Sequence, residues 1–333
     1  MGSFFIFISQ KDTQMKSLVI LLLGIGLQGS IDAQNSKNQE KGSPHKGVTL
    51  IVLGNVQDAG SPQAACKKSC CADLWKHPKQ DRKVTSLGII DYDLQKNYIF
   101  DASPDFPHQL QLLQEQSGTA DKTAPDGIFI THAHIGHYTG LMFLGREAMN
   151  SKNVPVYAMP RLKKYVENNG PWSQLTHLKN ISLQEMQNEV PLQINTHLQV
   201  TPIQVPHRDE YSETVGYLIK GPNKKALFIP DIDKWNVWKH TVTDLIKTVD
   251  YAFLDATFYD AEEVGFRDIA EIPHPLVTES MELFKSLSPQ DKKKVYFIHF
   301  NHTNALLLPD SPQTKAVLAN GFRIARLGDK VEL

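Results

Sequence analysis

The sequence has few cysteines, no excess charge of either sign and no apolar stretch that spans a bilayer comfortably. Its 333 residues include three cysteines, and the formal net charge is −1. Because three is an odd number, at least one thiol is left out of any disulfide arrangement within the chain. The balanced charge gives no indication of a nucleic-acid or membrane-surface partner. The length and apolar content suffice for a full core, in one large domain or two small ones.

The N-terminus has the pattern of a secretory signal. Lys16 precedes the apolar run "SLVILLLGIGL", which small and polar residues follow, and no cysteine comes after it as a lipoprotein would require. We expect residues 1–33 to be a signal peptide cleaved after Ala33, with Met15 as an alternative start, and residues 34–47 to be a linker. The mature protein would be exported, periplasmic or secreted, without stable membrane insertion. An uncleaved membrane anchor is the alternative.

From Val48 onward strands dominate the pattern. Apolar runs predict strands at residues 48–54, 86–92, 97–103, 127–134, 197–207, 214–233 (two strands joined by a turn), 251–258, 293–300 and 322–333. Helices are expected from Phe106 to a stop at Gly118, at 139–149 and at 276–287. No linker interrupts 48–333, so we predict a single α/β domain of four layers, in which helices flank two sheets.

Three histidines crowd into "THAHIGH", directly after the apolar run "GIFI". His132 and His134 are two residues apart at the end of a strand, so their side chains point to the same side. His137 can reach a neighbouring position where the chain turns into a helix. Neutral imidazoles in this arrangement are good ligands for zinc or a similar ion. Three loop histidines without a joint role are the alternative.

Polar residues recur at the ends of later strands. His207 ends "LQVTPIQVPH", Asp231 ends "ALFIPD" and His299 ends "KKVYFIH". Strand ends are where α/β enzymes usually collect their sites. Any one of these residues alone is more typical of a satisfied strand end, but their repetition favours a shared site.

Together these residues resemble the metallo-β-lactamase superfamily, whose signature is H-x-H-x-D-H followed by a His, an Asp and a His on later strands. The resemblance covers nearly the whole chain after the linker. It implies an αββα sandwich with metal ions at one sheet edge. It also implies one metal held by His132, His134 and His207 and a second held by His137 and His299, with Asp231 bridging the two.

Within that superfamily, the chain is more similar to the branch that holds the PQQ-biosynthesis protein B and the phosphonate-pathway cyclic phosphodiesterase. The similarity rests on "LGNVQDAGSPQAACKKSCC", "IPHPLVTESM", "IHFNHTNALL" and "FRIARLGDKVEL". Clustered thiols favour a metal site over strained bridges between neighbours, provided that a fourth ligand exists. The resemblance implies that Cys66, Cys70, Cys71 and His302 hold one structural zinc. A Cys66–Cys71 disulfide with a spare thiol is the alternative.

Gly136 stands where the signature has its aspartate, which would bind the second metal. Three outcomes are open. The second site could be held by His137, His299 and Asp231 alone, a nearby carboxylate such as Asp58 could stand in, or the protein could work with one metal. We favour a retained but weakened second site.

Two further features follow from the resemblance. "YAFLDATFYD" and the later "IPHP" imply that His274 is a general acid for the leaving oxygen and that Asp255 orients it. Asp101, at the end of "NYIFDAS", would hold a ligand histidine in its metal-binding tautomer. A loop histidine between two prolines is the alternative for His274.

The leading hypothesis is an exported metal-dependent hydrolase that cleaves a small or cyclic phosphodiester with a metal-activated water. Its cofactors would be one or two catalytic Zn²⁺, with Mn²⁺ or Fe²⁺ as alternatives, and one structural Zn²⁺. Its partner would be a small molecule rather than a nucleic acid, and a homodimer is compatible with the resemblance. The alternatives are an iron-dependent oxygenase like those in the PQQ-biosynthesis branch and a non-catalytic metal- or ligand-binding protein.

Overall fold

The structure is a computed structural model that describes residues 46–119, 121–265 and 272–333. The expected signal peptide and nearly all of the expected linker lie outside the described residues. The described residues form one compact unit. Among the described residues, no helix combines the length and the apolar character that crossing a membrane requires.

Two seven-stranded sheets form the centre of this unit. The first has the order β14 (Lys330–Glu332), β1 (Val48–Gly54), β2 (Ser86–Asp91), β3 (Lys96–Phe100), β4 (Gly127–Phe129), β5 (Val154–Ala158) and β6 (Ile181–Glu185). Strands β14 to β3 pair antiparallel, whereas β3 to β6 pair parallel. The carboxyl ends of β3 and β4 therefore meet at the same edge of the sheet.

The second sheet is built in the same way. Its order is β13 (Arg323–Ile324), β12 (Val295–Ile298), β11 (Tyr251–Asp255), β10 (Lys225–Ile229), β9 (Val215–Lys220), β8 (Gln199–Gln204) and β7 (Leu192–Gln193). Strands β10 to β13 pair parallel, and β7 to β10 pair antiparallel. The carboxyl ends of β10, β11 and β12 thus share one edge.

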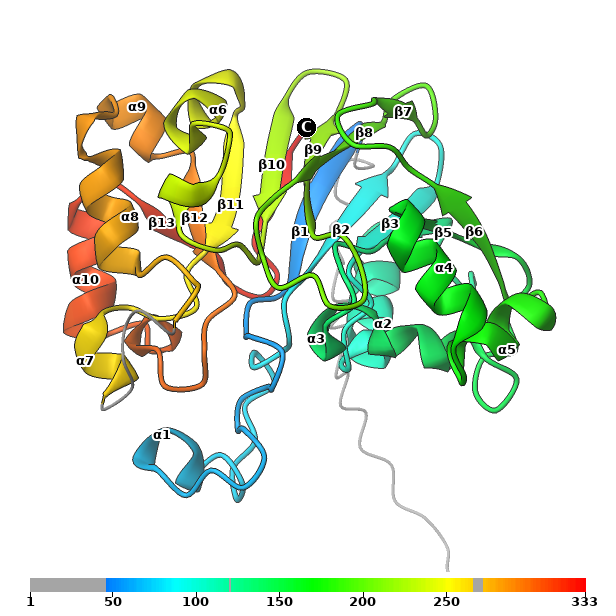
Figure 1. The fold of residues 1–333 in the computed structure, drawn as a ribbon, viewed down its shortest axis with the longest axis horizontal. Helices are drawn as coiled ribbons and strands as arrows, with labels where there is room; N and C mark the ends of the chain where they lie inside the picture. The colour runs from blue at the N-terminus through cyan, green and yellow to red at the C-terminus, as the bar shows by residue number, and fades with distance from the viewer. Residues whose placement is uncertain (1–45, 120, 266–271) are drawn as a thin grey trace, which may run out of the picture. The chain divides into compact units, whose positions relative to one another are not determined.

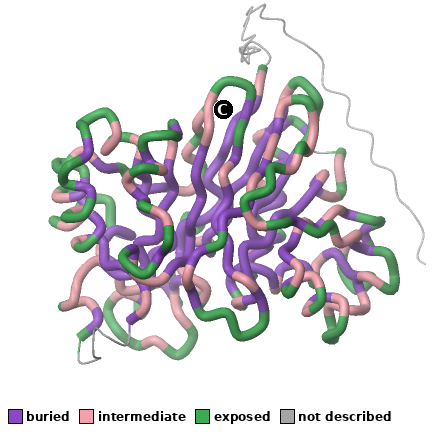
Figure 2. The backbone as a smooth tube through the Cα atoms, turned by 45° about the horizontal axis from the view of Figure 1, so that its top comes forward, coloured by how far each residue is buried: buried purple, intermediate pink, exposed green. Residues whose placement is uncertain are grey.

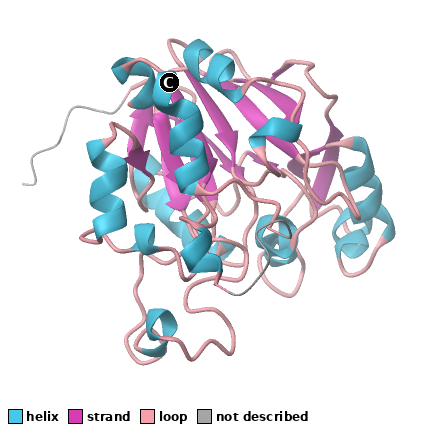
Figure 3. Ribbon diagram, turned by 60° about the vertical axis from the view of Figure 1, so that its left-hand side comes forward, coloured by secondary structure: helices cyan, strands magenta, loops and turns pink. Residues whose placement is uncertain are grey.

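Helices cover the outer faces of both sheets, as Figures 1 and 3 show. On the first sheet lie α2 (Phe106–Ser117), α3 (Ile135–Tyr138), α4 (Pro160–Asn168) and α5 (Trp172–His177). On the second lie α6 (Val242–Thr248), α8 (Val277–Leu283) and α10 (Pro312–Ala319). The short helix α9 (Pro289–Lys292) precedes β12 and buries no residue. The short helices α1 (Ser69–Ala72) and α7 (Ala261–Val264) lie in loops beyond the strand ends.

Three apolar clusters account for these four layers. Both faces of β1 are buried: Leu50 and Val52 join the cluster between the two sheets, while Ile51 joins the cluster under α2. A strand buried on both faces needs the unbroken apolar run that "VTLIVLG" supplies. Figure 2 shows this burial along the central strands. The predicted αββα sandwich is confirmed.

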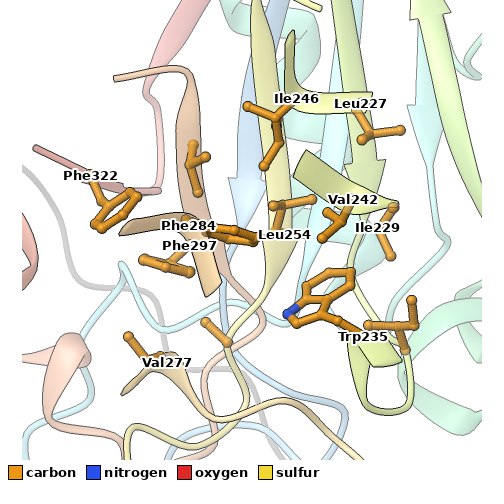
Figure 4. Packing of buried hydrophobic residues seen from close by; sticks show 14 of the residues in the cluster. Leu227, Ile229, Trp235, Val242, Ile246, Leu254, Val277, Phe284, Phe297 and Phe322 are labelled. Carbon is orange, nitrogen blue, oxygen red and sulfur yellow. The ribbon is translucent and has the colours of Figure 1, made fainter. Parts of the chain in front are cut away.

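Aromatic side chains fill the space between the sheets. Phe100 stacks on Phe129 with ring centroids 4.6 Å apart, and Tyr217 of the opposite sheet meets Phe100 edge-on at 5.4 Å. The cluster on the outer face of the second sheet joins Phe297 to Phe284 and Trp235 of the covering segments (Figure 4). Large rings of this kind contribute much of the buried area in a core, and they fix the strand ends on which the polar residues lie.

Three of the predicted elements differ from the structure. Residues 322–333, expected as a strand, form two short strands, β13 and β14, that belong to different sheets. Residues 139–149 were expected to form a helix, but a 3₁₀ helix, η1 (Thr139–Leu144), ends where Gly145 turns extended at φ −69° and ψ 171°. Strand β4 ends at Phe129 rather than at 134, so the histidines leave the sheet in an extended loop. The sequence pattern did not predict β5, β6, β7, α4, α5 and α6, because these segments lack the strong apolar runs on which the predicted elements rest.

Candidate metal centre

The parallel strand ends of both sheets deliver polar side chains to one place. Asp101 follows β3, Asp231 follows β10 by two residues, Asp255 ends β11 and His299 follows β12. Asp101 and His299 adopt left-handed backbone conformations, at φ 65° and φ 70°. Such conformations are uncommon for residues other than glycine and gather at functional sites. The chain therefore keeps an unfavourable backbone geometry where these two side chains are needed.

The first group of potential ligands consists of His132, His134, His207 and Asp231, whose ligand atoms all lie within 4.8 Å of one another. His132 Nε2 is 2.8 Å from His134 Nδ1 and 3.4 Å from Asp231 Oδ2. His207 Nε2 is 3.3 Å from Asp231 Oδ1. The structure thus brings together the three histidines that the sequence placed around one metal.

Two atoms of this group have no hydrogen-bond partner among the described residues. His207 Nε2 and Asp231 Oδ1 are buried and unsatisfied, although they face each other. Leaving a buried polar atom unpaired costs about 1–3 kcal/mol, so native proteins rarely do it without a reason. A divalent cation between the two atoms would satisfy both, and an imidazole nitrogen with a carboxylate oxygen is a donor set that zinc accepts.

The second group consists of Asp58, His137, Asp231 and His299. His137 Nε2 lies 2.9 Å from Asp58 Oδ1 and 3.8 Å from Asp231 Oδ2, and His299 Nε2 lies 3.2 Å from the same Asp58 oxygen. Asp231 belongs to both groups, which is the bridging position expected for it. Of the three outcomes open for the second site, the geometry matches the one in which Asp58 stands in.

Hydrogen bonds orient the histidines from behind. Asp101 Oδ2 lies 2.8 Å from His137 Nδ1, as the sequence predicted for this acid, and its Oδ1 accepts the Thr131 amide at 2.8 Å. Three similar contacts were not predicted: Thr131 Oγ1 lies 2.9 Å from His132 Nδ1, Thr257 Oγ1 lies 2.9 Å from His299 Nδ1, and Asp233 Oδ1 lies 3.0 Å from His207 Nδ1. By occupying Nδ1 they leave Nε2 for a metal.

The electrostatics of the centre favour positive charge. Burial opposes ionisation of Asp58 and Asp231, but the neighbouring histidines outweigh it and hold the pKa of both carboxyls well below the usual range. Burial also opposes protonation of His137, yet the charges of Asp58 and Asp101 raise its pKa well above the ordinary value. The negative charge of the carboxylates therefore requires compensation by imidazolium groups or by a metal cation. A metal that binds here would have to displace the imidazolium protons.

His274 and Asp255 lie beside the two groups. His274 Nδ1 is 2.8 Å from Asp255 Oδ2 and 3.2 Å from Asp231 Oδ1. Burial disfavours the charged imidazole, but the charges of Asp255 and Asp231 outweigh it and raise the pKa of His274. With Nδ1 held by Asp255, Nε2 is the nitrogen left for a ligand. This is the pairing that the sequence predicted.

A cavity of about 610 Å³ opens next to His274. It is lined by Gln57, Ala59, Gln63, Arg208, Thr257, Phe258, Ile272, Pro273, His274, Asn301 and His302. The described residues that line it include no carboxylate, whereas Arg208 brings a guanidinium cation. The sequence reasoning missed Arg208, although it directly follows His207. A cavity with this lining suits an anionic ligand.

The three cysteines lie close to His302, and all four ligand atoms are within 4.8 Å of one another. All three thiols are free, which contradicts the alternative of a Cys66–Cys71 disulfide. Cys70 Sγ and Cys71 Sγ are 3.8 Å apart, which matches the separation of about 3.8 Å that a tetrahedral zinc with bonds of about 2.3 Å imposes. Burial and the neighbouring sulfurs raise the pKa of Cys70 to about 12, so three thiolates at this spacing need a cation.

Known proteins resemble the chain over most of its length. A family model described as "Beta-lactamase superfamily domain" matches residues 96–300. Coenzyme PQQ synthesis protein B of Methylorubrum extorquens (strain PA1) is 24% identical over 314 residues, covering 85% of this chain and 99% of that protein. The structure of Zn²⁺-bound PqqB from Methylobacterium extorquens has a TM-score of 0.71 at 21% identity and covers 86% of this chain and 100% of that one.

A diphosphatase from the PhnP family has a TM-score of 0.60, also at 21% identity, and covers 86% of this chain and 98% of that one. These two likenesses to solved structures show the shared fold. The segment that matches the family model is more than half of the chain, and it contains every residue of the two histidine groups except Asp58. The chain therefore belongs to the metallo-β-lactamase superfamily.

Proposed function

We propose that this protein is a metal-dependent hydrolase that cleaves a small or cyclic phosphodiester. The observation that carries the proposal is the pair of ligand groups sharing Asp231, beside a cavity that holds Arg208 and, among its described residues, no acid. A pair of adjacent cation sites suits displacement at phosphorus, and an arginine suits a phosphate oxyanion. The diphosphatase of the PhnP family, which has the same fold, supports a phosphorus-containing substrate.

Zinc is the metal we propose for the centre, with Mn²⁺ or Fe²⁺ as alternatives, because imidazole and carboxylate donors suit all three. The Zn²⁺-bound PqqB of the same fold supports this choice. When bound, the metals supply Lewis-acid chemistry, lowering the pKa of water and neutralising phosphoryl charge. His132, His134 and His207 would hold one ion, His137 and His299 would hold the other, and Asp231 would contact both. A separate zinc would be structural, held by Cys66, Cys70, Cys71 and His302.

The chain's own residues would bind the substrate and move one proton. Arg208 would pair with a phosphate oxygen, and the amides of Gln57 and Asn301 offer further donors in the cavity. His274 would donate the proton on Nε2 to the leaving oxygen, while Asp255 holds its Nδ1 proton at 2.8 Å. A histidine whose pKa is raised by two carboxylates carries that proton near neutral pH.

Replacing Arg208 with alanine tests the anionic substrate. We expect the wild type to hydrolyse bis(4-nitrophenyl) phosphate in a chelator-sensitive reaction. In the variant, KM should be about 10- to 100-fold higher, because the substrate loses one charge-assisted hydrogen bond of about 1.5–3 kcal/mol. The turnover number should change little, because this contact binds ground state and transition state alike. Steady-state kinetics with the metal-loaded protein measure both constants.

Arg146→Ala is the matched control, since Arg146 is exposed and pairs with its neighbour Glu147 at 3.1 Å. Its kinetics should match those of the wild type, and Arg208→Lys should recover part of the lost affinity. If Arg208→Ala leaves KM unchanged, the cavity does not bind the phosphate. If the metal-loaded wild type does not hydrolyse phosphodiesters at all, the proposed function is wrong.

His274→Ala tests the general acid. A poor leaving group needs a proton in the transition state, whereas 4-nitrophenolate does not. We expect the rate for a phenyl or alkyl diester to fall by about 10²–10⁴, the usual contribution of general acid catalysis, and the rate for the 4-nitrophenyl diester to fall far less. Rates for a series of aryl diesters with leaving groups of different pKa measure the difference. Equal losses across the series would show that His274 has another role.

A step in the synthesis of PQQ is a second candidate, favoured by the similarity to coenzyme PQQ synthesis protein B along almost the full length of that protein. The histidine-rich first group would also accept Fe²⁺. Oxygen consumption that depends on added iron, in a protein that does not hydrolyse diesters, would favour this candidate over the hydrolase.

A further inference from the structure

Gly136, which lies between His134 and His137, packs directly against Asp58. A Cβ atom added at position 136 would lie 2.5 Å from Asp58 Cα and 2.6 Å from both its Cγ and its Oδ1. Non-bonded carbon atoms prefer a separation of about 3.5–4.0 Å, so no side chain fits there without moving the backbone of residue 58. The space that a side chain at 136 would occupy is filled by the carboxylate of Asp58.

Asp58 directs its carboxylate into the second ligand group. Its Oδ1 atom lies 2.9 Å from His137 Nε2 and 3.2 Å from His299 Nε2, and these are the two nitrogens that face Asp231 and the group's interior. The side chain is only 11% exposed. One oxygen placed between two imidazole nitrogens, at the edge of a group that also contains Asp231, has the position of a ligand rather than of a surface acid.

We propose that Asp58 is a ligand of the second metal, delivered by the loop after β1 into the space that Gly136 leaves free. Gly136 is then required by the ligand and is not a gap in the site. The inference rests on the proposed function, because it presupposes that the second group holds a cation. It makes the second group as complete as the first, because each then has three side chains in addition to the shared Asp231. These are three histidines in the first group, and two histidines and Asp58 in the second.

The loop that carries Asp58 is anchored on both sides. The Gln57 amide donates to the carbonyl of Phe300 at 2.8 Å, and the Phe300 amide donates to the carbonyl of Asn55 at 2.8 Å. These bonds place Asp58 beside His299, the residue before Phe300. Further along, the Gln63 amide donates to Cys71 Sγ at 3.4 Å. The loop is thus tied to the end of β12 and to the cysteine group, which explains how a residue from a loop can keep a fixed position at the centre.

Metal titration of single and double variants tests the assignment. Asp58→Asn keeps the shape of the side chain and removes its charge, whereas Gly136→Ala keeps Asp58 but puts a Cβ atom where its carboxylate lies. The control is Asp73→Asn, which makes the same chemical change at an exposed position of the same loop region, where the carboxylate lies 3.9 Å from the exposed His77. Zn²⁺ affinities are measured by competition with a chromophoric chelator, and Co²⁺ spectra report the environment of each ion.

We expect Asp58→Asn and Gly136→Ala each to lower the affinity of the second group for its ion by about 100-fold or more. Removing only a residue that positions a ligand already lowers metal affinity by about 10–100-fold. The ion of the first group should keep its affinity, and the cysteine group should still bind its zinc, which also shows that the variants fold. Because both substitutions remove the same interaction, the double variant should lose no more than either single one. Asp73→Asn should match the wild type.

Unchanged affinity of the second ion in Asp58→Asn would overturn the assignment while leaving the hydrolase proposal intact. Additive losses in the double variant would show that Gly136 acts independently of Asp58, and would also overturn it. A wild type that binds only one ion at the centre would instead remove the two-metal basis of the proposed function. The two failures are therefore distinguishable in one set of titrations.

Discussion

Asp231→Asn should lower the turnover of a phosphodiester by about 10³–10⁴-fold, which corresponds to the several kcal/mol that metal ions contribute to such reactions. Asp231 is the only residue of the described chain that belongs to both histidine groups. Its Oδ1 faces His207 at 3.3 Å, and its Oδ2 faces His132 at 3.4 Å and His137 at 3.8 Å. Asparagine keeps one oxygen but loses the other and the negative charge, so a single substitution weakens the binding of both ions.

The measurement combines elemental analysis with the rate of bis(4-nitrophenyl) phosphate hydrolysis. Asp233→Asn is the comparison, because the Asp233 carboxylate contacts Nδ1 of His207 at 3.0 Å, the nitrogen that faces away from the metal site. Its effect on metal affinity should be about 10–100-fold and confined to the first group. The ion at the cysteines should persist in both variants. Wild-type turnover in Asp231→Asn would mean that the two histidine groups do not form one catalytic centre.

Most of the centre could be predicted from the sequence because its ligands follow a local rule. His207, Asp231 and His299 each close an apolar run. For Asp231 and His299 these runs become neighbouring parallel strands, whose carboxyl ends meet at one edge whatever the details of packing. The pair at His132 and His134 follows the same rule through its spacing. The structure places all of these residues together, as the resemblance to the superfamily implied.

The remaining features depend on contacts that no local pattern encodes. Asp58 lies beside a residue 78 positions later in the chain, and the reason for that approach is a missing side chain at Gly136. In the sequence Asp58 was therefore only one of several open possibilities. Arg208 is one residue past a predicted ligand, but its place in the cavity depends on how the loop after β8 turns. The prediction of a helix at 139–149 was wrong because the chain turns extended at Gly145, so only the 3₁₀ helix η1 forms before it.

The cysteine group and the second metal should depend on each other, because they share two segments of the chain. Asp58 and Cys66 lie on one loop, and His299 and His302 lie on another, three residues apart. A zinc at the cysteines would clamp these two loops together, so it would fix both Asp58 and His299 on one side of the second group. None of the four ligands of the first group lies on either of these two loops, so the loss of the structural zinc should affect the metal affinity of the first group less.

A double variant, Cys66→Ser with Cys70→Ser, tests this dependence. We expect it to lose the structural ion and to bind the ion of the second group about 10–100-fold more weakly, the range seen when groups that position metal ligands are removed. The first group should keep its affinity. Lys67→Ala, at a position between the two cysteines that is not part of the ligand group, is the control for local damage to the loop. Elemental analysis and chelator competition give the occupancy of each group. If the second ion is retained with wild-type affinity after the structural ion has gone, hydrogen bonds such as that between Gln57 and Phe300 hold Asp58 without help from the cysteines.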